Sequence, residues 1–326
     1  MATVEPGLDV VTGAFSYTGR YIAQRLLAQG RQVRTLTNHP QRPGTEDVKI
    51  DVAPLQFTDR AALVESLRGA DVLYNTYWVR FRHGRIGFGE AIANTRTLVG
   101  AAVEAGVRKI VQISVSNPSI DSHLDYYAGK ARTEEIVQAS GLKWAIVRPT
   151  LVFGTGDILI NNIAWLLRRM PVFVIPGLGG YRVQPVAVED VAEIATWAAE
   201  QSHNLTVDAA GPDTLTYTEL VERIAIAVGR RPKFVYFSPR LTLWAGDLVA
   251  AYVHDVLLTR QELQGLMEEL LVSSEKPRGS RRIDNWLLGT SDSIGRNYAS
   301  ELDRHWRGVH APATLPAAFR PEAPPG

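Results

Sequence analysis

The first half of the chain alternates short β-rich runs with helix-forming segments, and this alternation constrains the fold more than any other feature. Strands are expected at residues 8–11, 32–37, 48–52, 71–75, 109–113 and 144–148. Helices are expected over residues 20–29, 59–69 and 91–106, and from before residue 130 to residue 140. Strands separated by helix-length connections pair in parallel through right-handed crossovers. The sequence therefore predicts a doubly wound α/β fold that binds ligands at the carboxyl ends of its strands.

A loop with two glycines follows the first predicted strand and has the sequence TGAFSYTG. Gly13 permits a tight turn off the strand, and Gly19 permits the next helix to pack closely against the sheet. Between them, backbone N–H groups at the helix start would face a pyrophosphate, as in a Rossmann-type fold, although Ser16 replaces the usual central glycine. An ordinary strand-to-helix turn is the alternative. The residues expected to contact the pyrophosphate are Gly13, Phe15, Ser16, Tyr17, Thr18 and Gly19.

The residues after the second and third strands bear on which nicotinamide dinucleotide is bound. A carboxylate after the second strand would accept from the ribose 2′-OH of NAD(H), whereas arginine would pair with the 2′-phosphate of NADP(H). The chain has Asn38 and Arg42 there, which slightly favours NADP(H) over NAD(H), unless Arg42 is only a solvated loop residue. Asp51 and Val52 are expected to end the third strand near the adenine, and Asp51 would serve equally as a cap for the next segment.

Tyr126 and Lys130 lie four residues apart at the expected start of a helix, which places them on one face. A nearby ammonium group would lower the tyrosine pKa and make the phenol an acid/base near neutral pH. The same lysine would reach the cofactor ribose. A solvated surface pair is the alternative for this spacing alone, and the position after the fifth strand favours the catalytic interpretation.

Taken together, these segments resemble a known family. The glycine loop, the run from Lys109 to Ser114, the Tyr126–Lys130 segment and Arg148–Thr150 are similar to the short-chain dehydrogenase/reductase superfamily. Within it, the chain resembles the atypical, extended branch that includes complex I accessory-subunit-like and NmrA-like proteins. Further segments resemble bacterial proteins described as NAD(P)-binding or epimerase/dehydratase-like: Tyr74–Trp78, Asn117–Ser119 and Asp157–Trp165. The likeness covers about residues 8 to 305.

The resemblance implies further site residues. The implied cofactor contacts are Asn75, Thr76, Tyr77, Ile113, Lys130, Pro149, Thr150, Leu151 and Val152. In active members a serine or threonine near the end of the fifth strand holds the substrate carbonyl, but here Val115 occupies that position. Ser116 is the candidate substitute, although strand alternation turns it away from the direction that Val115 faces. Loss of such a hydrogen bond costs on the order of a hundredfold in rate.

Composition limits the classes of function. The 326 residues carry a net charge of +1, so no overall field attracts nucleic acid or an anionic membrane, although a local basic patch stays open. The absence of cysteine excludes disulfides and thiol chemistry and fits a reducing cytoplasm, the expected location. The seven histidines show no metal-binding spacing, so no metal is predicted. The basic run from Arg80 to Arg85 is interpreted as a solvated face, with an acidic substrate as the alternative contact.

No stretch approaches 18 uncharged apolar residues, so no transmembrane segment is expected, and the N-terminus lacks the features of a signal peptide. Leu241–Leu258 comes nearest and is broken by Asp247, His254 and Asp255, which favours an amphipathic helix packed on a core or a partner. Residues 310–326 are rich in proline and are expected to form a disordered tail.

The expected organisation is a dinucleotide-binding domain over residues 1–155, with its sheet completed by residues 182–210, and a smaller, mostly helical substrate-binding portion. That portion comprises residues 156–181 and 211–309, and a helix start with capping-box spacing is expected in it at Thr216 and Glu219. The favoured function is an NAD(P)-dependent oxidoreductase acting on a small organic molecule. A non-catalytic NADP(H)-binding sensor or assembly protein is the alternative, and a sugar-nucleotide epimerase or dehydratase is a second one. The sequence leaves open whether the chain forms a homo-oligomer.

Overall fold

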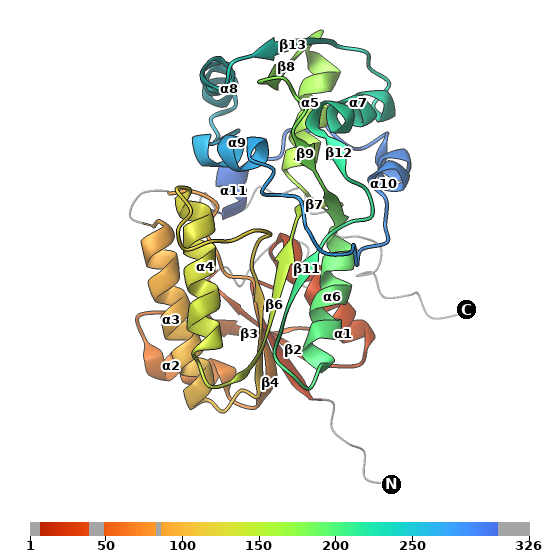
Figure 1. Cartoon of the computed structure of the whole chain (residues 1–326). Coiled ribbons are helices and arrows are strands. Elements are labelled where there is room, and N and C mark those ends of the chain that lie inside the picture. Colours follow the sequence, from red (N-terminus) through yellow and green to blue (C-terminus); the bar gives the residue numbers. More distant parts are fainter. Residues whose placement is uncertain (1–6, 39–48, 83–85, 306–326) are drawn as a thin grey trace, which may run out of the picture.

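The computed structural model describes residues 7–38, 49–82 and 86–305, and its centre is a seven-stranded parallel sheet (Figure 1). The strands are β1 (Leu8–Thr12), β2 (Gln32–Thr37), β3 (Asp51–Pro54), β4 (Ala70–Asn75), β5 (Lys109–Ile113), β6 (Lys143–Pro149) and β11 (Leu205–Ala209). Their order in the sheet is β11-β6-β5-β4-β1-β2-β3. The change of direction after β1 is the topological switch point at which such sheets bind ligands. The predicted Rossmann-type sheet is confirmed.

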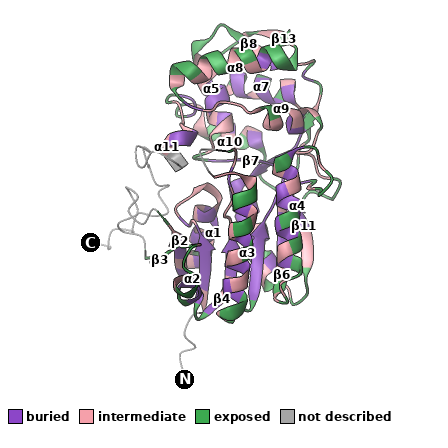
Figure 2. Cartoon of the chain, turned by 90° about the vertical axis from the view of Figure 1, so that its left-hand side faces the viewer, coloured by how far each residue is buried: buried purple, intermediate pink, exposed green. Residues whose placement is uncertain are grey.

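Helices cover both faces of this sheet. On one face α1 (Tyr17–Ala28) packs against α6 (Val188–Glu200). The other face carries α2 (Arg60–Leu67), α3 (Phe88–Glu104) and α4 (Asp125–Gln138) (Figure 1). Separate apolar clusters fill the two layers, the first including Ile22 and Val191, and the second including Leu63 and Leu98. In Figure 2 the sheet is buried, and the helices on its two faces are partly exposed.

The third strand differs from its prediction. The expected strand over residues 48–52 was to end at Asp51 and Val52, but β3 begins at Asp51 and continues to Pro54. In this register Asp51 lies opposite Arg34 of β2, and the two side chains form an ion pair at 2.5 Å. The apolar run gave the wrong limits because pairing with β2, rather than local hydrophobicity, sets where the strand lies.

The seventh strand comes from much later in the chain. After β6 the chain leaves the sheet, and it returns through α6 to β11, which pairs with β6 from Leu205 opposite Ala145 to Ala209 opposite Pro149. The local sequence LTVDA is short and carries an aspartate, so its apolar pattern alone did not identify it as a sheet strand.

The remaining elements form the upper part of the molecule in Figure 1. They are β7 (Leu151–Phe153), α5 (Leu159–Arg169), β8 (Val172–Pro176), β9 (Arg182–Val183), β10 (Pro185–Ala187), β12 (Leu215–Thr216), α7 (Tyr217–Ala227), β13 (Lys233–Phe237), α8 (Pro239–Val253), α9 (Arg260–Met267), α10 (Ile283–Thr290) and α11 (Glu301–His305). The short strands pair as β7 with β10, β9 with β12 and β8 with β13. The predicted capping box at the start of α7 is confirmed, with Thr216 and Glu219 each bonding the other's backbone N–H.

Neither a membrane span nor a metal centre is found in the described part of the chain. Its longest helix, α3, has 17 residues, and no helix there is long and apolar enough to cross a bilayer. Among the same described residues, no group of three or more His, Cys, Asp or Glu side chains is arranged to hold a metal ion.

Candidate cofactor and active site

The glycine loop joins β1 to α1 and is folded tightly on itself. Gly13 has a φ of 66°, in the left-handed region that favours glycine. Ser16 donates to the Gly13 carbonyl from its backbone N–H at 2.7 Å and from its hydroxyl at 2.6 Å. A Cβ on Gly19 would lie 2.2 Å from that same carbonyl oxygen, so no side chain fits there. The two glycines therefore supply the turn and the close helix packing that the sequence predicts.

The N-terminal end of α1 lies at the carboxyl end of β1, where a pyrophosphate would bind. The first turn of α1, all of it described, contains no acidic residue, and the Ser16 side chain bonds the Gly13 carbonyl instead of capping the helix. Backbone N–H groups and the positive end of the helix dipole are then directed toward this edge of the sheet. Together with the space that Gly19 leaves, this arrangement fits a dinucleotide phosphate.

A buried polar network fixes the neighbouring strand ends. The Thr12 hydroxyl accepts from the backbone N–H groups of Thr76 at 2.7 Å and Tyr77 at 3.1 Å, and it donates to the Asn75 side chain at 3.1 Å. Asn75 in turn donates to Gln112 at 2.8 Å. The loop after β4 is thereby tied to the ends of β1 and β5. Thr12 and Gln112 were not among the predicted site residues, because polar side chains inside apolar strands carry no distinctive spacing.

Lys130 belongs to α4, and its side chain lies at the end of β5. The residue is almost fully buried, with 4% of its surface exposed. Its ammonium group donates to the Ile113 carbonyl at 3.0 Å and lies 4.9 Å from the centre of the Trp78 ring. Burial lowers the pKa of Lys130 to about 7, and the carboxylate of Glu134 only partly opposes this shift. The amine therefore changes charge close to neutral pH.

Glu134 is held on the far side of Lys130 by a second buried network. Its carboxylate accepts from Arg148 at 2.6 and 3.0 Å and from the hydroxyl of Ser114 at 2.5 Å. Arg148 therefore takes most of the negative charge of Glu134, which explains why burial dominates the pKa of Lys130.

Tyr126 is surrounded by aromatic rings. Its ring makes edge contacts with Trp78 at 6.1 Å, Phe88 at 6.0 Å and Tyr127 at 5.4 Å between centroids. Gly129 allows α4 to approach this group, because a Cβ there would lie 2.9 Å from the Trp78 ring. The predicted pair of Tyr126 and the buried lysine thus lies on one helix at the carboxyl edge of the sheet.

The pKa of Tyr126 is raised, which corrects the expectation that Lys130 lowers it. Burial is the main cause, the Glu262 carboxylate adds to it, and Arg80 opposes it. The lysine ammonium is directed at the Ile113 carbonyl and the Trp78 ring, so it does not stabilise a phenolate here. In this structure the phenol remains protonated near neutral pH.

Helix α9 packs over Tyr126 and Tyr127, although it lies more than 130 residues away in the sequence. The backbone N–H of Tyr126 donates to the Gln261 side chain at 3.1 Å. Gly265 lies against the neighbouring ring, since a Cβ there would come within 2.8 Å of Tyr127. A capping box of Thr259 and Glu262 starts the helix, and its T-x-x-E spacing was the one sequence signal for it.

Arg80 holds α9 and α11 against the loop after β4. It pairs with Glu262 of α9 and, at 3.3 Å, with Glu301 of α11, and it donates to the Leu257 carbonyl at 3.4 Å. The interpretation of the basic run as a solvated face is therefore wrong for Arg80, because two distant carboxylates cover it. Residues 83–85 of the run lie outside the described residues.

The end of β5 presents no free hydroxyl toward Tyr126. Val115 is 6% exposed and packs with Tyr127 and Leu124 in a small apolar cluster that Tyr126 borders. The Ser116 hydroxyl donates to the Leu270 carbonyl at 2.6 Å. The structure thus places the predicted catalytic Ser116 in a contact with the upper part of the molecule, away from the direction of Val115.

The segment Pro149–Val152 reaches the same edge from β6. Thr150 donates its backbone N–H to Ala209 at 3.1 Å, and Leu151 donates to Gln184 at 3.2 Å, so both backbones are held by the returning chain. Just beyond, Gly154 lies beside the glycine loop, since a Cβ on it would come 3.2 Å from the Tyr17 hydroxyl. The predicted cofactor contacts after β6 and within the glycine loop are therefore brought together.

The residues that were predicted to distinguish NAD(H) from NADP(H) or to contact the adenine do not all lie where the sequence places them. Asn38 is exposed just after β2, where an adenosine ribose is expected, and Arg42 lies outside the described residues. The carboxylate of Asp51 is paired with Arg34, and Val52 is 41% exposed at the start of β3. Asp51 and Val52 thus begin an edge strand, so the prediction that they end the third strand is wrong, while their contact with an adenine stays a prediction.

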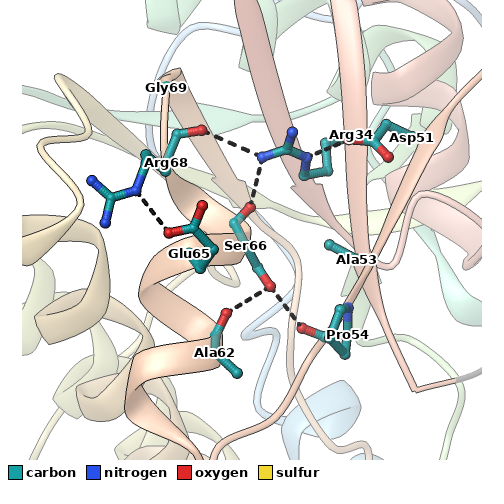
Figure 3. A pocket seen from close by; sticks show the side chains of 9 residues that line it. All are labelled: Arg34, Asp51, Ala53, Pro54, Ala62, Glu65, Ser66, Arg68 and Gly69. Atoms are coloured by element: carbon teal, nitrogen blue, oxygen red, sulfur yellow. Dashed lines mark hydrogen bonds and ion pairs between the residues drawn. The ribbon is translucent and has the colours of Figure 1, made fainter.

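A hollow of ≈ 540 Å³ lies between β3 and α2 (Figure 3). Arg34 crosses it and donates to the carbonyls of Ser66 at 3.1 Å and Arg68 at 3.3 Å as well as to Asp51. Its guanidinium is therefore occupied by protein partners. The hollow includes Gly69, which precedes the amino end of β4, so it lies on the flank of the sheet and not at the glycine loop.

Comparison with known proteins identifies the family. The profile of the NAD(P)H-binding family matches residues 13–156, which span the glycine loop, both residues of the tyrosine–lysine pair and β2 to β7. Residues 13–156 therefore form an NAD(P)H-binding domain of known type. The relatives agree with the resemblance of the chain to the atypical branch of the short-chain dehydrogenase/reductase superfamily.

The relatives of this chain match it over different shares of their own lengths. An uncharacterised protein of Mycobacterium tuberculosis is 30% identical over 68% of this chain, which spans only 23% of that protein. A ceramide reductase of Caulobacter vibrioides is 28% identical over 77% of this chain and 80% of its own length. The mitochondrial NADH dehydrogenase 1 alpha subcomplex subunit 9 of Arabidopsis thaliana is 28% identical over 69% of this chain and 59% of its own.

Solved structures of the superfamily share the fold. Citrobacter triphenylmethane reductase, complexed with NADP(H), has a TM-score of 0.70 at 17% identity and covers 87% of this chain and 99% of its own. Thermus thermophilus UDP-glucose 4-epimerase, complexed with NAD, has a TM-score of 0.61 at 19% identity over 82% of this chain and 100% of its own. The fold thus accommodates either dinucleotide in different proteins.

Proposed function

We propose that the chain is an NAD(P)-dependent oxidoreductase that transfers hydride between a nicotinamide cofactor and a small organic substrate. The observation that carries the proposal is that one edge of the sheet holds the Gly13–Gly19 loop together with Tyr126 and Lys130. The reductase names of a relative and of a structural neighbour support the same class of reaction.

The cofactor would be held by three parts of this edge. The glycine loop and the start of α1 would bind the pyrophosphate, and Lys130, which donates only one of its three N–H groups to Ile113, would bind the nicotinamide ribose. Asn38 after β2 carries no charge that would repel a 2′-phosphate, so NADP(H) is favoured. The bound nicotinamide supplies or accepts the hydride.

Tyr126 would act as the proton donor. Burial and Glu262 raise its pKa, so the phenol is protonated near neutral pH, which is the form that can give a proton to a carbonyl oxygen as hydride reaches the carbon. The aromatic rings of Trp78 and Phe88 would exclude water from the reacting atoms.

The test is substitution of the phenol, Tyr126→Phe. Loss of the proton donor is expected to lower NADPH-dependent turnover by about 10²–10⁴-fold while the NADPH dissociation constant stays nearly unchanged. Tyr127→Phe is the matched control, since it removes a hydroxyl from the adjacent buried ring in the same cluster. Unchanged turnover in Tyr126→Phe would reject the assigned role.

A non-catalytic NADP(H)-binding sensor or assembly protein is the second candidate. Val115 and the engaged hydroxyl of Ser116 favour it, because the substrate carbonyl then lacks its usual second hydrogen-bond donor. A relative that is named as a subunit of mitochondrial NADH dehydrogenase is consistent with such a role.

A substrate panel separates the two candidates. Purified protein is incubated with NADPH or NADH and with aldehydes, ketones, enones and nucleotide sugars, and cofactor absorbance is followed alongside binding measured by calorimetry. Turnover of any member supports the oxidoreductase. Tight cofactor binding without consumption across the whole panel supports the sensor.

A further inference from the structure

Helix α8 has its large apolar side chains on the outside. Four of them lie at helical spacing on one face and are 41%, 59%, 55% and 79% exposed, in the order Leu241, Trp244, Leu248 and Tyr252. We call these four residues the α8 stripe. Thr242 is the only buried residue of the helix. No described residue of the chain covers the stripe, so of the two expected contacts of this helix, a core or a partner, a partner is the one left for its large apolar side chains.

The inward face of α8 is made of small and β-branched residues. Thr242 is buried, Val249 and Val253 are half-buried, and the helix contacts the strands β8 and β13; Leu243 is the one large apolar residue of α8 that is half-buried. An ordinary surface helix places its large apolar residues on the inside, so α8 is reversed. Figure 2 shows α8 as a largely exposed helix at the end of the molecule opposite the N-terminus.

The same end of the molecule is basic. Lys233 begins β13 and is exposed, and Arg230 and Arg231 precede it. The strand β13 separates these three residues from the first turn of α8, where Arg240 is also exposed. Asp247 is the one carboxylate on α8. Lysine and arginine beside an exposed Trp, Tyr and Leu stripe match an anionic bilayer surface, where aromatic rings lie at the headgroup level.

A second copy of the chain fits this surface less well. A two-fold dimer through the α8 stripe sets the same surface against itself. Such a dimer brings the basic residues of both copies, Arg230, Arg231, Lys233 and Arg240, to one interface, where Asp247 is the one carboxylate that α8 offers them. An anionic surface attracts all four.

We propose that the α8 stripe and its basic neighbours form a docking surface for an anionic lipid bilayer. The helix lies in the interface with the stripe directed into the headgroup region, and the glycine loop at the far side of the β7–β13 part remains in water. The proposal does not depend on whether the protein catalyses hydride transfer.

The test is co-sedimentation of the full-length protein with vesicles of phosphatidylcholine, with and without phosphatidylglycerol. Binding is expected to the anionic vesicles, and salt is expected to weaken it. The stripe variant Trp244→Gln/Leu248→Gln/Tyr252→Gln is expected to bind about tenfold or more weakly, because it removes most of the inserted apolar area. The basic variant Arg230→Gln/Arg231→Gln/Lys233→Gln should lose about fivefold per charge.

Leu288→Gln is the control, because Leu288 is a leucine on α10 that is 74% exposed, more than either leucine of the stripe. It is expected to bind like the unaltered protein. Each variant is checked by circular dichroism and NADPH binding, since all the altered side chains are exposed. Failure to bind anionic vesicles, or equal binding by the stripe variant, overturns the proposal. So does a dimer in analytical ultracentrifugation that the stripe variant dissociates, because the occupant is then a second copy.

Discussion

Gly19 lies so close to the Gly13 carbonyl that the glycine loop has room for a hydrogen atom but not for a methyl group. The neighbouring atoms are backbone, so they cannot move aside as a flexible side chain would. Gly13 contributes differently, through its positive φ. At the residue scale, the geometry of the loop therefore depends on two separate properties of glycine: the missing side chain of Gly19 and the positive φ of Gly13.

The substitution Gly19→Ala tests this geometry. The new Cβ is expected to displace the loop, weaken NADPH binding on the order of tenfold, and lower the free energy of unfolding by about 1–3 kcal/mol. Gly89→Ala is the control, since Gly89 begins α3 with no atom within 4 Å of an added Cβ. Calorimetric NADPH binding and urea unfolding measure both effects, and a Gly19→Ala protein that matches Gly89→Ala would contradict the argument.

Lys130 gives the protein a pH-dependent stability. Its pKa is lowered to about 7 in the folded chain from the ordinary 10.5, so between these values the unfolded state binds more protons. Stability should therefore rise with pH across this window, by about 1 kcal/mol per pH unit, as the penalty of burying the ammonium is relieved. Lys130→Met removes this contribution.

Urea unfolding from about pH 7.5 to about pH 9 measures the free energy of unfolding of the unaltered chain and of Lys130→Met. Subtracting one value from the other cancels the contributions of the other titrating groups. The unaltered chain is expected to gain stability relative to Lys130→Met as the pH rises. Parallel stability curves would show that the amine keeps its ordinary pKa in the folded protein.

The sequence was sufficient to predict the positions of Gly13, Gly19, Tyr126 and Lys130, because each pattern is local. It was insufficient for the pKa of Tyr126. The groups that raise or oppose it, Glu262 and Arg80, come from segments that only the tertiary fold brings together. Asp51 was misassigned for the same reason, since its partner Arg34 is on another strand.

At the scale of elements, α9 and α11 are attached to the nucleotide-binding sheet through Arg80. The Glu301 side chain is only 8% exposed and that of Arg80 is 25% exposed, so this ion pair is shielded from solvent. Removal of the arginine would take one cation away from a buried carboxylate, which costs more than the loss of a surface pair.

The variant Arg80→Met is expected to lower the free energy of unfolding by about 2–3 kcal/mol and to increase hydrogen exchange in α9 and α11. Arg60→Met is the matched control, because the Arg60–Glu104 pair has both side chains more than half exposed. That control should change stability by at most about 1 kcal/mol. Equal effects from the two variants would mean that Arg80 does not fasten these helices.

Elements with long local patterns were predicted well from the sequence. Strand β5 and the capping box of α7 were placed at the correct residues, because both depend on neighbours along the chain. Residues 182–210 were expected to complete the sheet, but the limits of β11 within them were not predicted, and neither were the short strands β9 and β12. Each has few residues, and its pairing partner rather than its own sequence defines it.

At the scale of the whole molecule, we propose that residues 1–155 and 182–210 form one folding unit. The apolar cluster on the α1 side of the sheet draws on both segments. Its members from the second segment are Val186, Val188, Val191, Ala192, Ile194, Ala195, Ala198, Val207 and Ala209. Without them, α1 and the strands below it would expose a broad apolar face to water.

A fragment of residues 1–155 is therefore expected not to fold, although it contains nearly the whole segment that matches the NAD(P)H-binding family. The full chain is the reference, and near-ultraviolet circular dichroism with NADPH binding is the measurement. A fragment that unfolds cooperatively and binds NADPH as the full chain does would refute the proposed unit.

The outer strand β3 has a consequence for how copies of this protein meet. It has four residues, carries the charge of Asp51 and ends at Pro54, which has no N–H to donate. Such a strand offers little backbone to which another sheet can add. Sheet-to-sheet growth between molecules is therefore blocked at this edge, and crowding in a cell should not convert the folded chain into extended β assemblies through β3.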